Sequence, residues 1–121
     1  MNAVGIDLHK AFLVVAVEDE TGPVGKPKRL WCRNEDAILK HFQTLAPFRA
    51  VIEASCTYRW LYDLLSPLGS VVLAHPYRLR AIVAARAKTD KLDAALLAKL
   101  LHADLIPQAY VPPEPIQQLR D

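Results

Sequence analysis

The sequence predicts a single domain of the mixed α/β class, in which three antiparallel strands are followed by parallel strands that alternate with helices. Two observations predict this class. Short apolar segments rich in β-branched residues come first, and from residue 34 onward such segments alternate with longer amphipathic segments typical of helices. The chain also has 121 residues, of which 52% are hydrophobic, and this suits one domain with a real core.

The first three strands are expected to form a hairpin with one added strand. Residues 3–8 and 12–18 are apolar and separated by a short polar break, which predicts two buried strands of a hairpin. The stretch "TGPVG" at 21–25 has turn chemistry, and the partly alternating stretch at 28–33 predicts a third strand. We therefore expect the chain to begin with an antiparallel unit.

Helices and strands alternate in the remainder of the predicted domain. Asn34, Thr57 and Thr89 each precede a helical pattern and are expected to cap it. The segment 107–121 differs, because four of the nine prolines fall in residues 107–115, and this predicts an extended connector after a domain over 1–106. The expected elements are a helix over 35–45, a strand over 49–54, a helix over 58–65, a strand over 70–74, a helix over 78–87 and a helix from Thr89 to about Leu105.

Basic residues cluster between residues 78 and 91, although the net charge is only +2. This stretch carries five Lys or Arg residues against one acid, Asp90. The cluster favours contact with nucleic-acid phosphates, and an ordinary solvated helix face is the alternative. The expected phosphate contacts are Arg78, Arg80, Arg86, Lys88 and Lys91.

The composition argues against other classes of protein. Two cysteines, Cys32 and Cys56, make neither a disulfide framework nor a zinc site. The longest apolar run, residues 11–17, is too short to span a bilayer, and charged residues interrupt any signal-peptide pattern at the N-terminus. We therefore expect a cytoplasmic protein without membrane contact.

Four acidic residues form the candidate site. Asp7 interrupts the first strand, Glu53 ends the fourth strand, and Asp90 and Asp93 are expected on one face at the start of the last helix. Each has an ordinary explanation, such as a solvated strand end or a favourable helix dipole. Together, at one edge of a sheet, they would repel one another unless divalent cations lay between them. Two Mg²⁺ ions held by carboxylates can bind the attacking and leaving oxygens of a phosphodiester.

Three motifs resemble the signatures of DEDD transposases of the insertion-sequence-110 family, which also includes Piv-type invertases. They are "VGIDLHK" (4–10), "VIEASCTY" (51–58) and "KTDKLDAALLAKLL" (88–101). The resemblance implies an RNase H-like, or RuvC-like, fold with a mixed five-stranded sheet flanked by helices. It also implies that the four catalytic, metal-binding acids are Asp7, Glu53, Asp90 and Asp93.

The same resemblance implies a function and a set of partners. The expected activity is Mg²⁺-dependent DNA strand cleavage and recombination with two ions, Mn²⁺ being the alternative metal. A guide RNA from the element and a homo-oligomer in the full-length protein are also expected. The family uses a nucleophilic serine from a separate C-terminal domain, and none of Ser55, Ser66 and Ser70 matches it. We therefore expect the chain to be the N-terminal catalytic domain, inactive in strand exchange by itself.

Two other functions are compatible with the pattern. Actin-like and sugar-kinase ATPases share the strand order, but Leu8, His9 and Lys10 suit a phosphate loop poorly and no second glycine-rich loop follows. A non-catalytic nucleic-acid-binding module with this fold is the other alternative. His9 shares a strand face with Asp7, where it is expected to be partly buried or to touch a phosphate. Tyr58, Trp60, Tyr62 and Trp31 are expected in the core or at an interface rather than stacking on bases.

Overall fold

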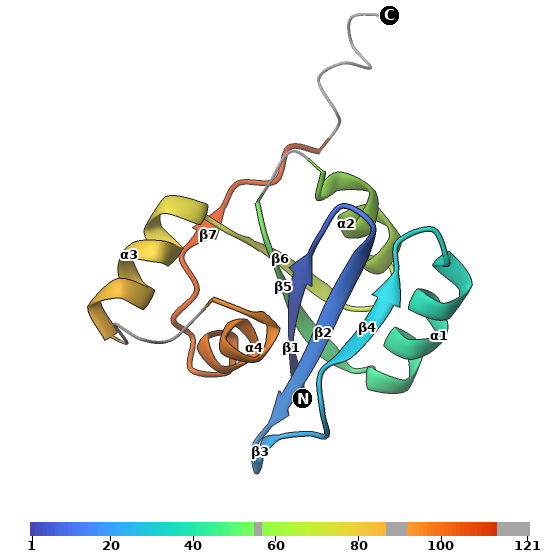
Figure 1. Cartoon of the computed structure of the whole chain (residues 1–121), viewed down its shortest axis with the longest axis horizontal. Helices are drawn as coiled ribbons and strands as arrows, with labels where there is room; N and C mark the ends of the chain where they lie inside the picture. Colours follow the sequence, from blue (N-terminus) through green and yellow to red (C-terminus); the bar gives the residue numbers. More distant parts are fainter. Residues whose placement is uncertain (55–56, 87–91, 114–121) are drawn as a thin grey trace, which may run out of the picture.

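A computed structural model describes residues 1–54, 57–86 and 92–113 of the chain. Within these residues, seven strands form one sheet and four helices flank it (Figure 1). None of these helices has the length and apolarity needed to cross a membrane. The elements are β1 (Asn2–Leu8), β2 (Phe12–Asp19), β3 (Gly22–Pro23), β4 (Lys28–Trp31), α1 (Glu35–Leu45), β5 (Phe48–Glu53), α2 (Arg59–Leu65), β6 (Ser70–Ala74), α3 (Pro76–Arg86), α4 (Ala94–His102) and β7 (Gln108–Ala109).

The sheet has the strand order β3-β2-β1-β5-β6-β7, and β4 also pairs with β2. Strand β1 is antiparallel to β2 and parallel to β5, while β5 is parallel to β6. An antiparallel start that continues into parallel strands is the arrangement of the RNase H-like fold, so the predicted fold class is confirmed. The five longer strands are those predicted. The two-residue strands β3 and β7 were not predicted, because two residues carry no periodicity.

Helices cover both faces of the sheet (Figure 1). On one face, α1 and α2 pack on the strands through Ile38, Phe42, Leu61 and Leu65. On the other face, α3 and α4 do so through one buried cluster. The alternation of strand side chains explains the division, since Val4 of β1 faces the first layer and the residues on either side of it face the second. The members of the second cluster are Ala3, Val51, Ala74, Leu79, Leu97, Leu100 and Leu101.

Helix α4 approaches β1 closely at Gly5. A Cβ atom at this position would lie 2.1 Å from the carbonyl oxygen of Ala94 and 2.4 Å from the nitrogen of Ala98. Only a residue without a side chain allows the strand and the helix backbone to come this near. Ala94 is the first residue of α4, so this contact fixes the start of the helix over Gly5. Gly5 lies two residues before Asp7 in β1.

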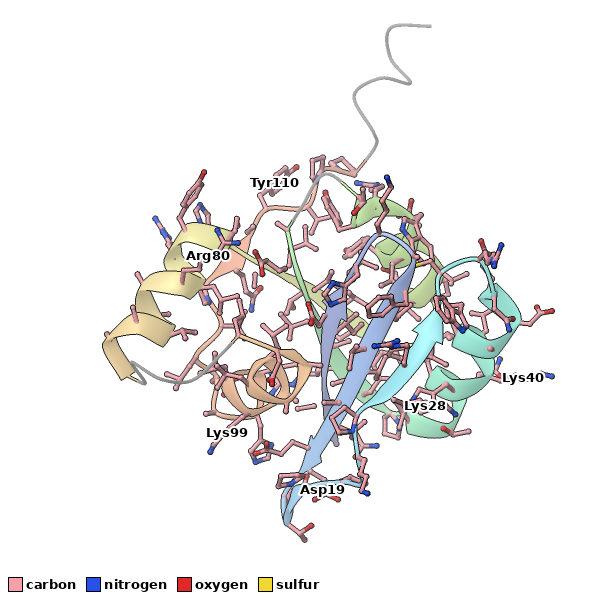
Figure 2. All side chains as sticks on the ribbon, viewed as in Figure 1. Asp19, Lys28, Lys40, Arg80, Lys99 and Tyr110 are labelled. Carbon is pink, nitrogen blue, oxygen red and sulfur yellow. The ribbon has the colours of Figure 1, made fainter. Side chains whose placement is uncertain are left out.

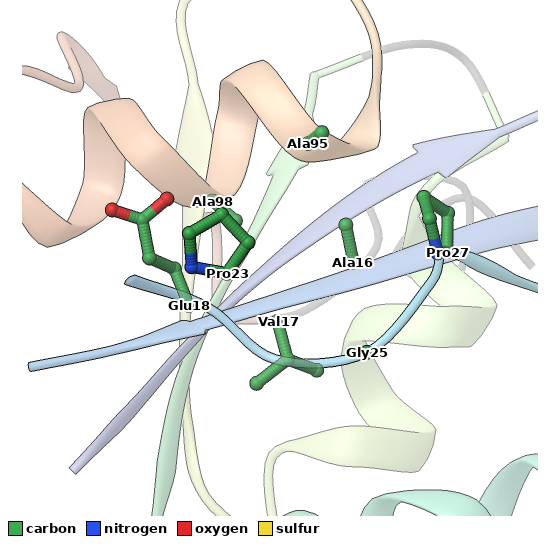
Figure 3. Close-up of a pocket in the computed structure, with 8 residues that line it drawn as sticks. All are labelled: Ala16, Val17, Glu18, Pro23, Gly25, Pro27, Ala95 and Ala98. Carbon is green, nitrogen blue, oxygen red and sulfur yellow. The ribbon is translucent and has the colours of Figure 1, made fainter. Parts of the chain in front are cut away.

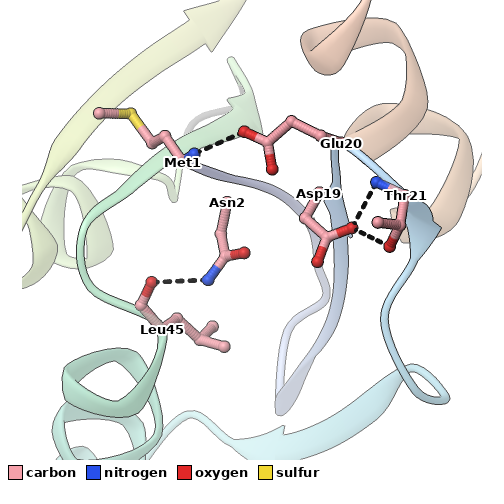
Figure 4. A network of polar contacts seen from close by, with 6 residues as sticks. All are labelled: Met1, Asn2, Asp19, Glu20, Thr21 and Leu45. Atoms are coloured by element: carbon pink, nitrogen blue, oxygen red, sulfur yellow. Dashed lines mark hydrogen bonds and ion pairs between the residues drawn. The ribbon is translucent and has the colours of Figure 1, made fainter.

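Polar contacts secure the ends of the first strands (Figure 4). The amino group of Met1 forms an ion pair with the Glu20 carboxylate at 2.8 Å, and the Asn2 side-chain amide donates to the carbonyl oxygen of Leu45 at 2.9 Å. The second bond joins β1 to the end of α1, and the first joins β1 to the end of β2. These contacts lie at the opposite end of β1 from Asp7.

The first part of the predicted connector lies against the domain. Strand β7 pairs antiparallel with β6, and the guanidinium of Arg59 donates to the carbonyl oxygens of Pro112 and Pro113. The same guanidinium forms an ion pair with Asp63 at 3.3 Å. Residues 108–113 are thus held by hydrogen bonds, and a further domain beyond the connector stays a prediction.

We predict that Gly5→Ala lowers the free energy of unfolding by at least about 3 kcal/mol, because the added methyl group would overlap backbone atoms that no rotamer change can move. The matched control is Gly25→Ala, where no atom lies within 4 Å of the added carbon and only the left-handed backbone, with φ of 66°, opposes alanine. That variant should lose about 1 kcal/mol. Urea denaturation measures both, and equal losses would contradict the close packing of α4 on β1.

Candidate functional site

Asp7 and Glu53 lie on adjacent parallel strands at the same edge of the sheet. Ile6 of β1 pairs with Ile52 of β5. The next residues along these parallel strands are Asp7 and Glu53, which therefore lie beside each other. Both lie on the sheet face that α4 packs against, because the residues before them, Ile6 and Ile52, point into the core on the opposite face. Their side chains are 33% and 29% exposed, respectively. The edge therefore presents two carboxylates that solvent can reach.

Each of these carboxylates has a nitrogen-bearing partner. Oδ2 of Asp7 lies 2.9 Å from Nε2 of His9. His9 follows Asp7 by two residues, on the same face and just past the end of β1. Oε1 of Glu53 accepts a hydrogen bond from Nη2 of Arg80 at 3.1 Å. Arg80 reaches this edge from α3 (Figure 2). Its side chain is 64% exposed. Each of the two acids thus has its own partner.

Asp93 caps α4 rather than lying inside it. Its backbone is extended, with φ of −142° and ψ of −178°, and its Oδ1 accepts from the backbone nitrogen of Leu96 at 2.9 Å. The prediction that Asp93 lies on one face inside this helix is therefore wrong, because Asp93 is the N-cap and α4 begins at the next residue, Ala94. The contact of Ala94 with Gly5 places Asp93 at the Asp7 end of β1. Asp90 lies outside the described residues, so its predicted position is not tested.

The donor set at this edge fits a divalent cation in its chemistry. Carboxylate oxygens are the ligands that Mg²⁺ prefers, and Asp7 and Glu53 supply them from neighbouring strands. Asp93 is the third acid in this region, with one oxygen engaged in the helix cap. Among the described residues, no three His, Cys, Asp or Glu side chains are arranged to hold a metal ion. Completing such a site would take a rotation of Asp93 or a contribution from Asp90.

The predicted basic cluster is only partly described. Arg78 and Arg80 are exposed on α3, and the structure brings Arg80 to the acidic edge. Arg86 is the last residue of α3. Lys88 and Lys91 lie outside the described residues, so their predicted phosphate contacts are not tested.

A second basic region was missed in the sequence. Trp31 was expected in the core or at an interface, and because its side chain is 52% exposed, only the interface alternative fits it. It contacts Phe12 edge-on, and the Arg29 guanidinium lies 4.2 Å from the Phe12 ring centre. The signal is present in "KPKRLWCR" at 26–33, which has four basic residues around one tryptophan. By contrast, the other three aromatic residues are partly buried against the core, as expected; they are Tyr58, Trp60 and Tyr62.

Other candidate groups offer no chemistry at the acidic edge. A small apolar hollow of about 60 Å³ lies between the β2–β3 region and α4, lined by residues such as Ala16, Pro23 and Ala98 (Figure 3). His41 of α1 has its Nε2 buried without a hydrogen-bond partner among the described residues. Burial, with a smaller effect of Lys28, lowers the pKa of His41, so the ring is neutral near pH 7.

We predict that Asp93→Ala lowers the free energy of unfolding by about 1 kcal/mol, because the backbone nitrogen of Leu96 loses its acceptor. Asp93→Asn should stay within a few tenths of a kcal/mol of the wild type, since asparagine caps equally well. Asn34→Ala, which removes the analogous cap of α1, is the matched control. Urea denaturation in chelator measures all three. A loss in Asp93→Asn as large as that in Asp93→Ala would show that the charge, and not the cap, stabilises the fold.

The sequence model of the insertion-sequence-110 DEDD family, described as transposase, matches residues 4–121. No curated protein matches the chain. The family match covers all three motifs that resembled this family, together with the strands and helices that carry the acids. The chain therefore belongs to the insertion-sequence-110 family of DEDD transposases.

Proposed function

We propose that this chain carries the metal-dependent catalytic site of the transposase, and that Asp7, Glu53, Asp90 and Asp93 are its metal ligands. The observation that supports the proposal best is the placement of Asp7 and Glu53 side by side on β1 and β5, with the start of α4 over the same end of β1. Membership of a DEDD transposase family supplies the reaction class, DNA strand cleavage and transfer.

The roles of the residues follow from their positions. Two Mg²⁺ ions, or Mn²⁺, would be held by the four acids, and when bound they would polarise the scissile phosphate and activate the attacking oxygen. His9 orients Asp7 through its bond to Oδ2, leaving Oδ1 directed elsewhere. Arg80 neutralises Glu53 and, once displaced from it, could donate two hydrogen bonds to a phosphate of the DNA.

The wider reaction involves partners that belong to the same proposal. DNA is the substrate, and a guide RNA selects it, as the resemblance to the family implies. A C-terminal domain supplies the nucleophilic serine, and the full-length protein acts as a homo-oligomer. The catalytic acids presented here would then cut only when the second domain is in place.

One observation favours a second function, a non-catalytic nucleic-acid-binding module. His9 and Arg80 pair with Asp7 and Glu53, respectively. A fold that has lost its catalytic role could keep such ion pairs as ordinary surface contacts. Metal binding distinguishes the two functions, because only the catalytic site requires it.

We predict that millimolar Mg²⁺ raises the melting temperature of the wild type and not that of Asp7→Asn or Asp90→Asn. A ligand that binds only the folded state adds about 2.7 kcal/mol at a hundredfold excess over its dissociation constant, and each variant should lose most of this gain. The control is Asp36→Asn, which removes one exposed acid from the first turn of α1 and should keep the Mg²⁺ response. Melting curves with chelator and with Mg²⁺ provide the measurement. An equal Mg²⁺ response in the wild type and Asp7→Asn would exclude Asp7 as a ligand.

A second prediction concerns Arg80. Its guanidinium competes with a cation for Glu53, so Arg80→Gln should bind Mg²⁺ about two- to fivefold more tightly, as expected for loss of an exposed ion pair worth up to about 1 kcal/mol. Arg78→Gln is the matched control, because Arg78 is exposed on the same helix. Isothermal titration with MgCl₂ measures the affinity. Weaker binding by Arg80→Gln alone would show that Arg80 supports the metal site instead of competing with it.

A further inference from the structure

We infer that an unpaired nucleic-acid strand binds to an aromatic and basic surface beside the acidic edge. This surface, called the stacking surface below, consists of His9, Phe12, Arg29 and Trp31, with Lys10 and Arg33 at its margin. The inference extends the proposed function by assigning the path of a single strand, but the surface contains no metal ligand. It can therefore be tested without metal.

The strand register places the stacking surface on the same sheet face as the acids. Asp7 of β1 pairs with Val14 of β2, which in turn pairs with Arg29 of β4, so the three lie in one row across the sheet. Phe12 and Trp31 pair in the next row on that face, toward the β1–β2 turn. Neighbouring strands lie about 4.8 Å apart, so Arg29 stands about 10 Å from Asp7.

Helix α4 leaves this part of the face open. It covers the other end of β1 and β2, where Ala94 and Ala98 pack against Ala16. On β4, by contrast, Arg29 and Trp31 are both exposed. Figure 1 shows α4 crossing the sheet away from β4. The uncovered region thus begins where the helix begins, next to Asp7.

Contacts among the rings give the surface a fixed shape. The His9 ring stacks on Phe12 with 4.6 Å between centres and 25° between planes, and the Arg29 guanidinium lies over the same ring. Trp31 meets Phe12 edge-on at 6.1 Å and 77°. Phe12 is therefore held by three neighbours, while Trp31 keeps half of its surface exposed. Such an indole is positioned to receive a base on its free face.

Positive charge surrounds the exposed indole. Lys10 and Arg33 line an open hollow of about 380 Å³ together with Trp31. The hollow forms because the backbone nitrogen of Cys32 bonds to the carbonyl oxygen of Ala11, which brings the β1–β2 turn beside the end of β4. Cations that flank an aromatic ring match the alternation of phosphate and base in a single strand. In a duplex the bases are stacked on one another and offer no free face to an indole, so the chemistry favours an unpaired strand.

His9 connects the stacking surface to the acids. Its ring stacks on Phe12, and its Nε2 bonds to the Asp7 carboxylate. A strand whose base stacks on Trp31 and whose phosphate meets Arg29 would extend across His9 toward Asp7. The stacking surface would in this way deliver a phosphodiester to the acidic edge.

The test measures the fluorescence of Trp31. In a Trp60→Phe background, Trp31 is the sole tryptophan of the chain. Titration with a short oligothymidylate, in chelator and at low salt, should quench this fluorescence, and duplex DNA of the same length should quench it much less. Oligouridylate with the same dependence on Trp31 would also support the inference, because base faces and phosphates are common to both strands. Stronger binding of the duplex would overturn it.

Substitutions locate the binding. Trp31→Ala should weaken oligothymidylate binding about five- to a hundredfold, as for loss of one base–aromatic stack, and Trp31→Phe should restore much of it. Arg29→Ala should reduce the slope of log affinity against log salt by about 0.7, whereas Lys40→Ala, at an exposed position of α1, should leave the slope unchanged. Anisotropy with labelled oligothymidylate measures the affinities of folded variants. Unchanged affinity in Trp31→Ala would overturn the inference, and it would leave the Mg²⁺ melting result untouched.

Discussion

Contact between α4 and β1 without an intervening side chain is the constraint on which the arrangement of this domain depends. Gly5 allows the helix backbone to rest directly on the strand, and alanines at Ala16, Ala94 and Ala98 continue this interface of small residues. Small residues bring the two backbones close, and the approach fixes where the helix starts. Asp93, the cap of that start, is consequently held at the Asp7 end of the strand. A larger residue at the interface would lift the helix, and with it the third acid, away from the sheet.

At the acidic edge, the carboxylates of Asp7 and Glu53 are partly buried and each has a hydrogen-bond partner. Asp7 and Glu53 stand on neighbouring strands, where two carboxylates without partners would repel each other. His9, just past the end of β1, is hydrogen-bonded to Asp7, and Arg80 of α3 donates a hydrogen bond to Glu53. Both partners are well exposed, so the pairs are weak and replaceable. Under the proposed function, weak pairs of this kind would release their carboxylates to a cation.

The sequence was sufficient for those parts of the fold that local patterns encode. The apolar β-branched strands and the Asn34 cap of α1, which accepts from the Ala37 nitrogen at 3.2 Å, follow from local chemistry. The start of α4 does not follow from local chemistry, because Thr89 and Asp93 are both good capping residues. The structure uses Asp93, and there the helix start is in close contact with Gly5. The choice between core and interface for Trp31 could not be made either, since its exposure depends on pairing with Phe12, nineteen positions earlier in the chain. Adjacency of Asp7 and Glu53 could be expected only once the strand order was assumed.

Residue size divides one face of this sheet into a half that α4 covers and a half that it leaves open. Where α4 lies, β1 and β2 present Ala3, Gly5 and Ala16, and the helix fills the space. Beyond the first residue of α4, the same face presents Asp7 and Phe12, which are too large or too polar to lie beneath a closely packed helix. The boundary between small and large side chains therefore determines where the helix can begin. Since the acids and the exposed aromatic residues both lie just past that boundary, the packing that stabilises the fold also decides which part of the sheet remains open for chemistry.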